Sequence, residues 1–181
     1  MKALENPDAQ FVRAARVCMD LGQVIEAAAE LDKVTSLGLE HPSALCVRWS
    51  IVAQSEDWDL CLELAEKIVD ADPEYLSGWI YRSFSLDFLD RTEEALEKLL
   101  PAAPLFPDDW NVNLDIAAYH CALGHLPAAR AWLAKAFALR EISWARKLAM
   151  EDPRLKRLRD QIHLIEPLQI ASATEPPQTA Y

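Results

Sequence analysis

The residues with most potential for chemistry are two histidines that flank a cysteine, His120, Cys121 and His125. Imidazole and thiolate groups are the ligands that zinc prefers, so this cluster could indicate a metal site. The two histidines are five positions apart, however, which does not place them on one helix face, and a Leu-Gly turn separates them. His41 and His163 are isolated. We therefore expect surface or packing roles for the histidines, and we predict no metal site and no cofactor.

Other catalytic patterns are missing from the sequence. It contains no Gly-rich phosphate loop, no G-x-S-x-G nucleophile motif, no H-E-x-x-H motif and no paired C-x-x-C motifs. Carboxylates cluster at Glu63 and Glu66, and again at 93–97, but these positions belong to the outer faces of expected helices, where they would be solvated. We therefore predict that the protein is not an enzyme.

The composition favours a helical protein. Half of the 181 residues are apolar, glycine is scarce, and alanine and leucine are abundant. The N-terminal residues do not resemble a signal peptide, and no run approaches the ~18 apolar residues of a membrane span. The four cysteines have no metal-type spacing, which indicates reduced, buried thiols. We expect a cytoplasmic protein without a membrane partner.

The net charge of −11 is unevenly distributed along the chain. Residues 1–129 contain 9 Lys and Arg against 23 Asp and Glu, whereas residues 130–160 contain 9 Lys and Arg against 4 acids. The basic stretch is either a solvated face or a docking patch for an acidic partner, which could be the acidic body of a second copy. Nine dispersed charges on an acidic protein do not favour nucleic-acid binding.

Four frames of 34 residues follow one another without insertion, starting at Asp8, Pro42, Leu76 and Trp110. Twenty residues into each frame the side chain is small: Ala27, Cys61, Ala95 and Ala129. Fifteen residues in, each frame has a residue assigned to a turn: Gly22, Glu56, Asp90 and Gly124. Small side chains are needed where two helices of a hairpin approach most closely. Each frame is therefore predicted to fold as two helices joined by a turn.

This period and pattern resemble the tetratricopeptide repeat (TPR) family. Its 34-residue repeat has a Trp, then Leu-Gly, a Tyr, an Ala, an aromatic residue and a closing Pro. The third frame matches through Trp79, Ala95 and Pro107, and the second through Asp57-Trp58 and Asp72-Pro73. The first and fourth frames match through Leu21-Gly22 and Leu123-Gly124. The resemblance covers residues 8 to about 141. It implies an all-α, right-handed α-solenoid of four helix-turn-helix repeats with C-terminal capping helices.

The expected organisation is a lead-in at 1–7, four repeats within 8–141 (about 8–41, 42–75, 76–109 and 110–143), capping helices at 142–164 and a disordered tail at 165–181. Gly38 is predicted to cap the helix over 23–37. Pro101 must kink or end the second helix of its frame. Trp49 occupies a slot that is usually small and faces Ala65, which indicates a volume swap across the hairpin or, alternatively, an exposed aromatic anchor.

The resemblance also implies a concave groove, lined by the first helix of each repeat, that takes an extended peptide or a helix. Tyr81, Phe84 and Phe88 are predicted at its centre, because aromatic anchors are common at interface hot spots. The further groove residues are Ile80, Arg13, Arg16, Ser50, Gln54, Asn111 and Asp115, and Arg13 and Arg16 are expected to read an acidic residue. A subclass of the family holds a terminal carboxylate with Lys, Asn and Arg. The corresponding slots here are Val12, Arg16, Val47, Ser77 and Tyr81, so we do not assign the chain to that subclass.

The leading hypothesis is a non-enzymatic scaffold or adaptor that binds an apolar or amphipathic segment of another protein or peptide. One alternative is a self-assembling unit, in which the basic cap docks on the acidic repeats of a second copy, so a homo-oligomer stays open. A further alternative resembles the small acidic TPR chaperones of bacterial secretion systems. Neither nucleic acid nor membrane is an expected partner.

Overall fold

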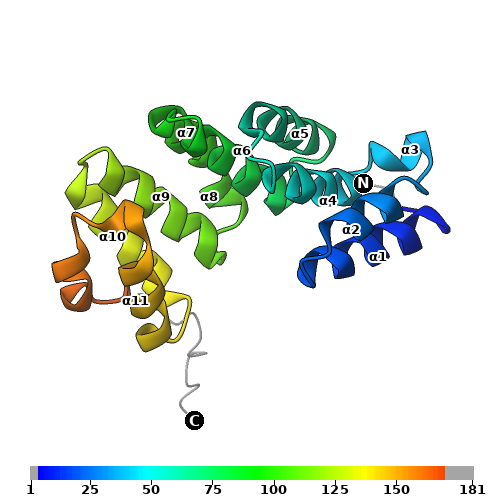
Figure 1. Cartoon of the computed structure of the whole chain (residues 1–181). Coiled ribbons are helices and arrows are strands. Elements are labelled where there is room, and N and C mark those ends of the chain that lie inside the picture. Colours follow the sequence, from blue (N-terminus) through cyan, green and yellow to red (C-terminus); the bar gives the residue numbers. More distant parts are fainter. Residues whose placement is uncertain (1–3, 170–181) are drawn as a thin grey trace, which may run out of the picture. The chain divides into compact units, whose positions relative to one another are not determined.

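The computed structural model describes residues 4–169, and over this range the chain has eleven α-helices, two short 3-10 helices and no strand (Figure 1). The described residues form two compact units, which divide between Pro107 and Asp108. The predicted all-α helical-repeat fold is confirmed. Among the described residues, no helix is both long enough and apolar enough to cross a membrane.

The N-terminal unit consists of three antiparallel helix pairs and two short helices. Its elements are α1 (Asp8–Asp20), α2 (Val24–Leu31), α3 (Ser36–Leu39), α4 (Pro42–Ala53), α5 (Trp58–Ala71), α6 (Leu76–Phe88), α7 (Thr92–Leu99) and α8 (Ala102–Leu105). α1 packs on α2, α4 on α5 and α6 on α7, and α5 also packs on α6, so successive pairs share their surfaces. This is the arrangement that the 34-residue frames predict.

All four predicted turn residues have a left-handed backbone. The φ angle is 72° at Gly22, 57° at Glu56, 58° at Asp90 and 84° at Gly124. A left-handed residue after a helix lets the next N–H groups bond back to the last carbonyls, which closes the helix and reverses the chain. The four small residues of the closest helix approach, Ala27, Cys61, Ala95 and Ala129, are each fully buried.

Trp49 is buried, which supports the volume swap and shows that the exposed-anchor alternative is wrong. Its side chain is 8% exposed and belongs to the same core cluster as Ala65, which is 0% exposed. The indole Nε1–H donates a hydrogen bond to the Ser85 hydroxyl over 3.1 Å. A large ring on α4 therefore fills the volume that a small side chain on α5 leaves open.

Gly38 does not cap the preceding helix, so this prediction is wrong. α2 ends at Leu31, and Gly38 lies inside the short helix α3, where Thr35 accepts a hydrogen bond from its N–H over 3.1 Å. The Asp8 carboxylate accepts the Thr35 N–H over 3.0 Å, and a Cβ atom at Gly38 would overlap that carboxylate and Val34. The glycine is therefore needed for a close tertiary contact, which the local sequence does not reveal.

The prolines of the third frame act as predicted. α7 ends at Leu99, and Pro101 lies between α7 and the four-residue α8. A proline lacks the N–H that continues a helix, so the helix ends here instead of running on. The boundary between the two compact units follows directly after Pro107.

The C-terminal unit consists of α9 (Trp110–Ala122), α10 (Leu126–Ala138), α11 (Ile142–Glu151), η1 (Pro153–Leu155) and η2 (Arg159–Leu164). α9 packs on α10, and η1 packs on α9. The segment 153–164 contains two short 3-10 helices, and its apolar residues Leu155, Leu158 and Ile162 are fully buried.

The last turns of the C-terminal unit differ in detail from the expected cap. Trp144 remains 47% exposed, and Ala145 and Ala149 are the residues of α11 that enter the core. In the stretch assigned to the tail, Ile165 is buried and the Leu168 N–H donates to the Ala134 carbonyl over 2.8 Å. The rest of the expected disordered tail, 170–181, lies outside the described residues.

Candidate binding surface

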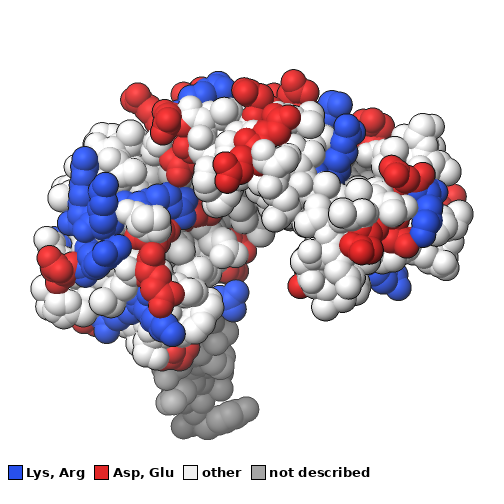
Figure 2. Space-filling view, viewed as in Figure 1, with Lys and Arg blue, Asp and Glu red and all other residues white. Residues whose placement is uncertain are grey.

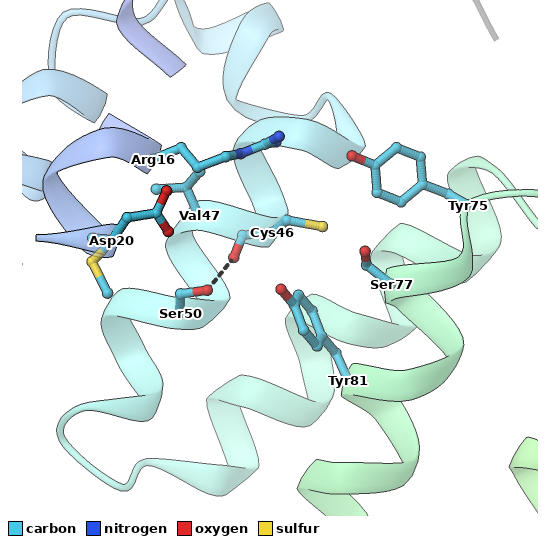
Figure 3. A pocket seen from close by; sticks show the side chains of 9 residues that line it. Arg16, Asp20, Cys46, Val47, Ser50, Tyr75, Ser77 and Tyr81 are labelled. Atoms are coloured by element: carbon cyan, nitrogen blue, oxygen red, sulfur yellow. Dashed lines mark hydrogen bonds between the residues drawn. The ribbon is translucent and has the colours of Figure 1, made fainter. Parts of the chain in front are cut away.

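The N-terminal unit has a pocket of about 280 Å³ where α1, α4 and α6 meet (Figure 3). One predicted groove residue from each of these three helices lines it: Arg16, Ser50 and Tyr81. The remaining lining residues are Met19, Asp20, Cys46, Val47, Tyr75 and Ser77. The pocket therefore contains three of the ten predicted groove residues.

Polar groups from different helices converge in this pocket. Figure 3 shows the Arg16 guanidinium extending toward the Tyr75 hydroxyl, with the Ser77 hydroxyl and the Cys46 thiol between the two tyrosines. The Ser50 hydroxyl donates to the Cys46 carbonyl over 3.1 Å. A guanidinium and several hydroxyl groups around one pocket can donate hydrogen bonds to an acceptor group of a ligand.

Burial keeps the weak acids of the pocket neutral at ordinary pH. It raises the pKa of the Cys46 thiol to about 11, although the Arg16 charge opposes the shift. Burial likewise raises the pKa of the Tyr75 and Tyr81 hydroxyls, and the charge on Cys46 would add to both shifts. Arg16 and Asp20 are thus the charged side chains in the lining, and the other polar groups are neutral donors and acceptors.

The predicted central aromatic residues form a packed cluster with two tryptophans. Tyr81 stacks on Trp49 with ring centroids 4.0 Å apart, and Phe88 stacks on Trp58 at 4.1 Å. Phe84 lies edge-on to both tryptophans at 6.2 Å. Phe88 is 52% exposed, whereas Tyr81 and Phe84 are partly buried. The aromatic groups therefore hold the helices together, and Tyr81 alone of the three lines the pocket.

The remaining predicted groove residues are more scattered. Arg13 and Arg16 line a second, smaller pocket of about 160 Å³ beside α1. Ile80 is partly buried, and Gln54 is exposed at the end of α4, and neither lines the main pocket. Asn111 is exposed at the start of α9, in the C-terminal unit.

Asp115 is covered by the chain's own C-terminal segment. Its carboxylate pairs with the Arg154 guanidinium over 2.8 Å, and Asp152 pairs with the same group over 2.7 Å. On the same helix Leu114 shares a core cluster with Leu155. This face of α9 is therefore covered by the chain's own C-terminal segment, so Asp115 does not belong to the proposed binding surface.

Sequence reasoning did not select Tyr75, Ser77, Asp20 or Trp58 for the site. Tyr75 is the last residue of the second frame and the N-cap of α6, and Ser77 lies in the first turn of α6. Their position at the start of the first helix of the third frame was the sequence feature that could have indicated them. Their convergence on Arg16 depends on how α1 and α6 both pack against α4.

Several Lys and Arg side chains of the basic stretch 130–160 form contacts within the C-terminal unit. Figure 2 shows Lys and Arg side chains gathered over this unit. The paired ones are Arg130 with Gln161, Lys135 over the Trp132 ring, Arg146 with the Ile165 carbonyl and Glu166, and Arg154 with its two carboxylates. Among residues 4–169, no group of three or more His, Cys, Asp and Glu side chains could hold a metal ion.

The architecture matches solved structures of MamA proteins over most of the chain. MamA residues 41 to the end from Desulfovibrio magneticus RS-1 superpose with a TM-score of 0.66 at 16% identity, covering 90% of this chain and 92% of that one. The fold is a TPR-like helical solenoid. A MamA RS-1 double mutant gives a TM-score of 0.63 at 18% identity, covering 75% of this chain and 76% of that one. MamA AMB-1 gives 0.60 at 13%, covering 88% and 98%. No protein-family model matches the chain, and no curated protein matches it.

Proposed function

We propose that the protein is a non-catalytic binding module that holds a segment of another protein in the pocket formed by α1, α4 and α6. The observation that supports this proposal is the position of the pocket. It is lined from three successive helix pairs and includes Arg16, Ser50 and Tyr81, which the family resemblance assigns to a concave, ligand-facing groove. TPR-like solenoids use such extended surfaces for binding partners.

The chemistry of the pocket favours a segment with an acidic residue next to a small apolar group. Arg16 is exposed, and no carboxylate among the described residues forms an ion pair with it. The Tyr75 and Tyr81 hydroxyls lie on the facing side, while Met19 and Val47 supply apolar surface. A carboxylate placed here would gain charge-assisted hydrogen bonds from Arg16. A volume of about 280 Å³ suits one or two side chains and not a whole helix.

The test uses affinity capture from a native cell extract with the full chain and two variants. Arg16→Glu reverses the exposed charge, and Tyr81→Phe removes one hydroxyl but keeps the ring that stacks on Trp49. We avoid Tyr81→Ala and Phe84→Ala, because both rings pack against tryptophans and their loss would disturb the fold.

Arg16→Glu is expected to weaken capture at least about tenfold, as expected for a hot-spot residue. Arg48→Glu is the matched control, because Arg48 is exposed on α4 and does not line the pocket. It carries the same charge change and should leave capture within about twofold of the wild type. Equal capture by Arg16→Glu and Arg48→Glu would show that the pocket is not the binding site.

The self-assembly alternative receives less support. It needs a basic cap that is free to dock, but Arg130, Lys135, Arg146 and Arg154 are engaged within their own unit. Solution mass measured against salt concentration separates the two hypotheses, because contacts between exposed charges are screened as salt rises. We expect a mass that does not depend on salt.

A further inference from the structure

Two histidines face each other at the turn between α9 and α10. His120 lies in the last turn of α9, and His125 is the N-cap residue of α10. Their Nδ1 atoms are 3.4 Å apart, and their ring centroids are 5.6 Å apart. His125 is exposed and His120 is partly exposed, so both rings can be reached from solvent.

The backbone of the turn brings these side chains together. The His125 N–H donates to the His120 carbonyl over 2.8 Å, and the Gly124 N–H donates to the Cys121 carbonyl over 3.0 Å. With φ of 84° at Gly124, this is a Schellman motif, in which the residues five apart commonly contact each other. The expectation that the Leu-Gly turn separates the two histidines is therefore wrong, because this turn folds one back onto the other.

The same motif closes other helix pairs without placing two imidazoles together. In the first pair the Gln23 N–H donates to the Cys18 carbonyl, and in the third the Arg91 N–H donates to the Leu86 carbonyl. The same backbone motif thus closes the first, third and fourth helix pairs, and in the fourth it brings together two side chains that can bind a metal.

The separation of the nitrogens fits chelation. Zinc binds imidazole nitrogen at about 2.0–2.1 Å in tetrahedral geometry, which puts two nitrogen ligands about 3.3–3.4 Å apart. The observed 3.4 Å between the Nδ1 atoms matches that spacing, and a bound metal would replace the hydrogen bond between the two rings.

We propose that His120 and His125 form a two-histidine binding site for a divalent transition metal such as Zn²⁺, Ni²⁺ or Cu²⁺. Its remaining coordination positions would be filled by water or by a ligand from a bound partner. Imidazole ligands select these metals, whereas Ca²⁺ and Mg²⁺ require oxygen ligands. Arg157 lies against Gly124, and its positive charge opposes any divalent cation, so binding should be weak and selectivity rests on the imidazole ligands.

Cys121 does not supply a third ligand, although it follows His120 in the sequence. Its side chain belongs to the core cluster of the C-terminal unit and is fully buried, and burial raises the pKa of its thiol. A two-ligand site binds more weakly than a closed four-ligand site, so the metal would be exchangeable and not part of the folding core.

The experiment is a Zn²⁺ titration of the full chain, followed by calorimetry and by NMR of the histidine side chains. One saturable site is expected in the wild type, with the resonances of His120 and His125 shifting together. His120→Gln and His125→Gln should each weaken binding at least about tenfold, because one imidazole alone cannot chelate. Mg²⁺ in the same titration should cause no such shifts.

The matched control is His163→Gln, which removes an exposed histidine of η2 and should bind Zn²⁺ like the wild type. Circular dichroism verifies that every variant keeps its helical content. Because Zn²⁺ must displace the imidazole protons, affinity should also fall as pH drops through the histidine pKa range. The proposal is overturned if the wild type shows no saturable binding, or if His120→Gln binds as tightly as the wild type.

Discussion

Replacing Arg154 with methionine tests what holds the C-terminal segment on α9. The Arg154 Nη2 atom lies 2.8 Å from Asp115 Oδ1 and 2.7 Å from Asp152 Oδ2. The three side chains are only 20%, 12% and 11% exposed, and the guanidinium also lies over the Tyr119 ring. Methionine keeps most of the side-chain volume, so the variant removes the charge and its hydrogen bonds without opening a large cavity.

The expected loss of stability follows from the two carboxylates that remain in the variant. Without Arg154 two carboxylates are left largely buried and near each other, and breaking a buried ion pair in this way costs about 3–5 kcal/mol. Because these groups keep some contact with water and Arg154 Nη1 has no hydrogen-bond partner, we expect the lower end, about 3 kcal/mol. For a unit of this size that corresponds to a fall in Tm of about 12–24 °C.

Native-state hydrogen exchange is the appropriate assay. The chain has two compact units, so unfolding of the whole molecule is not expected to be two-state, whereas amide protection in α9 and α10 reports the C-terminal unit alone. Arg159→Met is the matched control, since Arg159 is exposed on η2 and its loss should change stability by no more than about 0.5 kcal/mol.

A second variant distinguishes the ion pair from simple packing. Adding Asp115→Asn to Arg154→Met removes one stranded carboxylate, so the double variant should be more protected than Arg154→Met alone. The reasoning is refuted if Arg154→Met exchanges like the Arg159→Met control.

The remaining predictions concern the N-terminal unit. Gly38→Ala should lower the unfolding free energy of the N-terminal unit by about 1–3 kcal/mol, measured by native-state hydrogen exchange, because its Cβ would overlap the Asp8 carboxylate. Ser85→Ala should cost about 1–3 kcal/mol in the same assay, since the buried Trp49 indole N–H loses its acceptor. With a pKa of about 11, Cys46 should react with iodoacetamide at pH 8 roughly two hundredfold more slowly than an ordinary thiol, and faster as pH rises toward 11, as measured by mass spectrometry.

The helical repeat could be predicted because its signals are local and recur. A small residue where two helices touch and a left-handed residue between them are requirements of a single hairpin, and each is repeated four times along the chain. Pro101 ended its helix for an equally local reason, the missing N–H group. The sequence predicted capping helices within 142–164, but it did not reveal the 3-10 geometry of the segment that buries Leu155, Leu158 and Ile162.

The candidate site was predicted only in part. The register gave the face that contains Arg16, Ser50 and Tyr81, but not the convergence of Tyr75 and Ser77 on the same pocket. Such convergence depends on side chains from helices more than fifty residues apart, and their meeting is set by helix packing. Aromatic character alone likewise did not distinguish a ligand-facing ring from one that stacks on Trp49 or Trp58 inside the unit.

His120 and His125 show most clearly the difference between what the sequence determines and what only the three-dimensional structure decides. The sequence by itself determined that a turn follows α9, because Gly124 adopts the left-handed backbone that closes the helix. Only the three-dimensional structure decided that the turn brings the two imidazoles to 3.4 Å. Helix periodicity describes residues on one helix face, and it does not apply across a helix end. The fold therefore follows from periodic local requirements, while the sites depend on contacts that tertiary packing and turn geometry create.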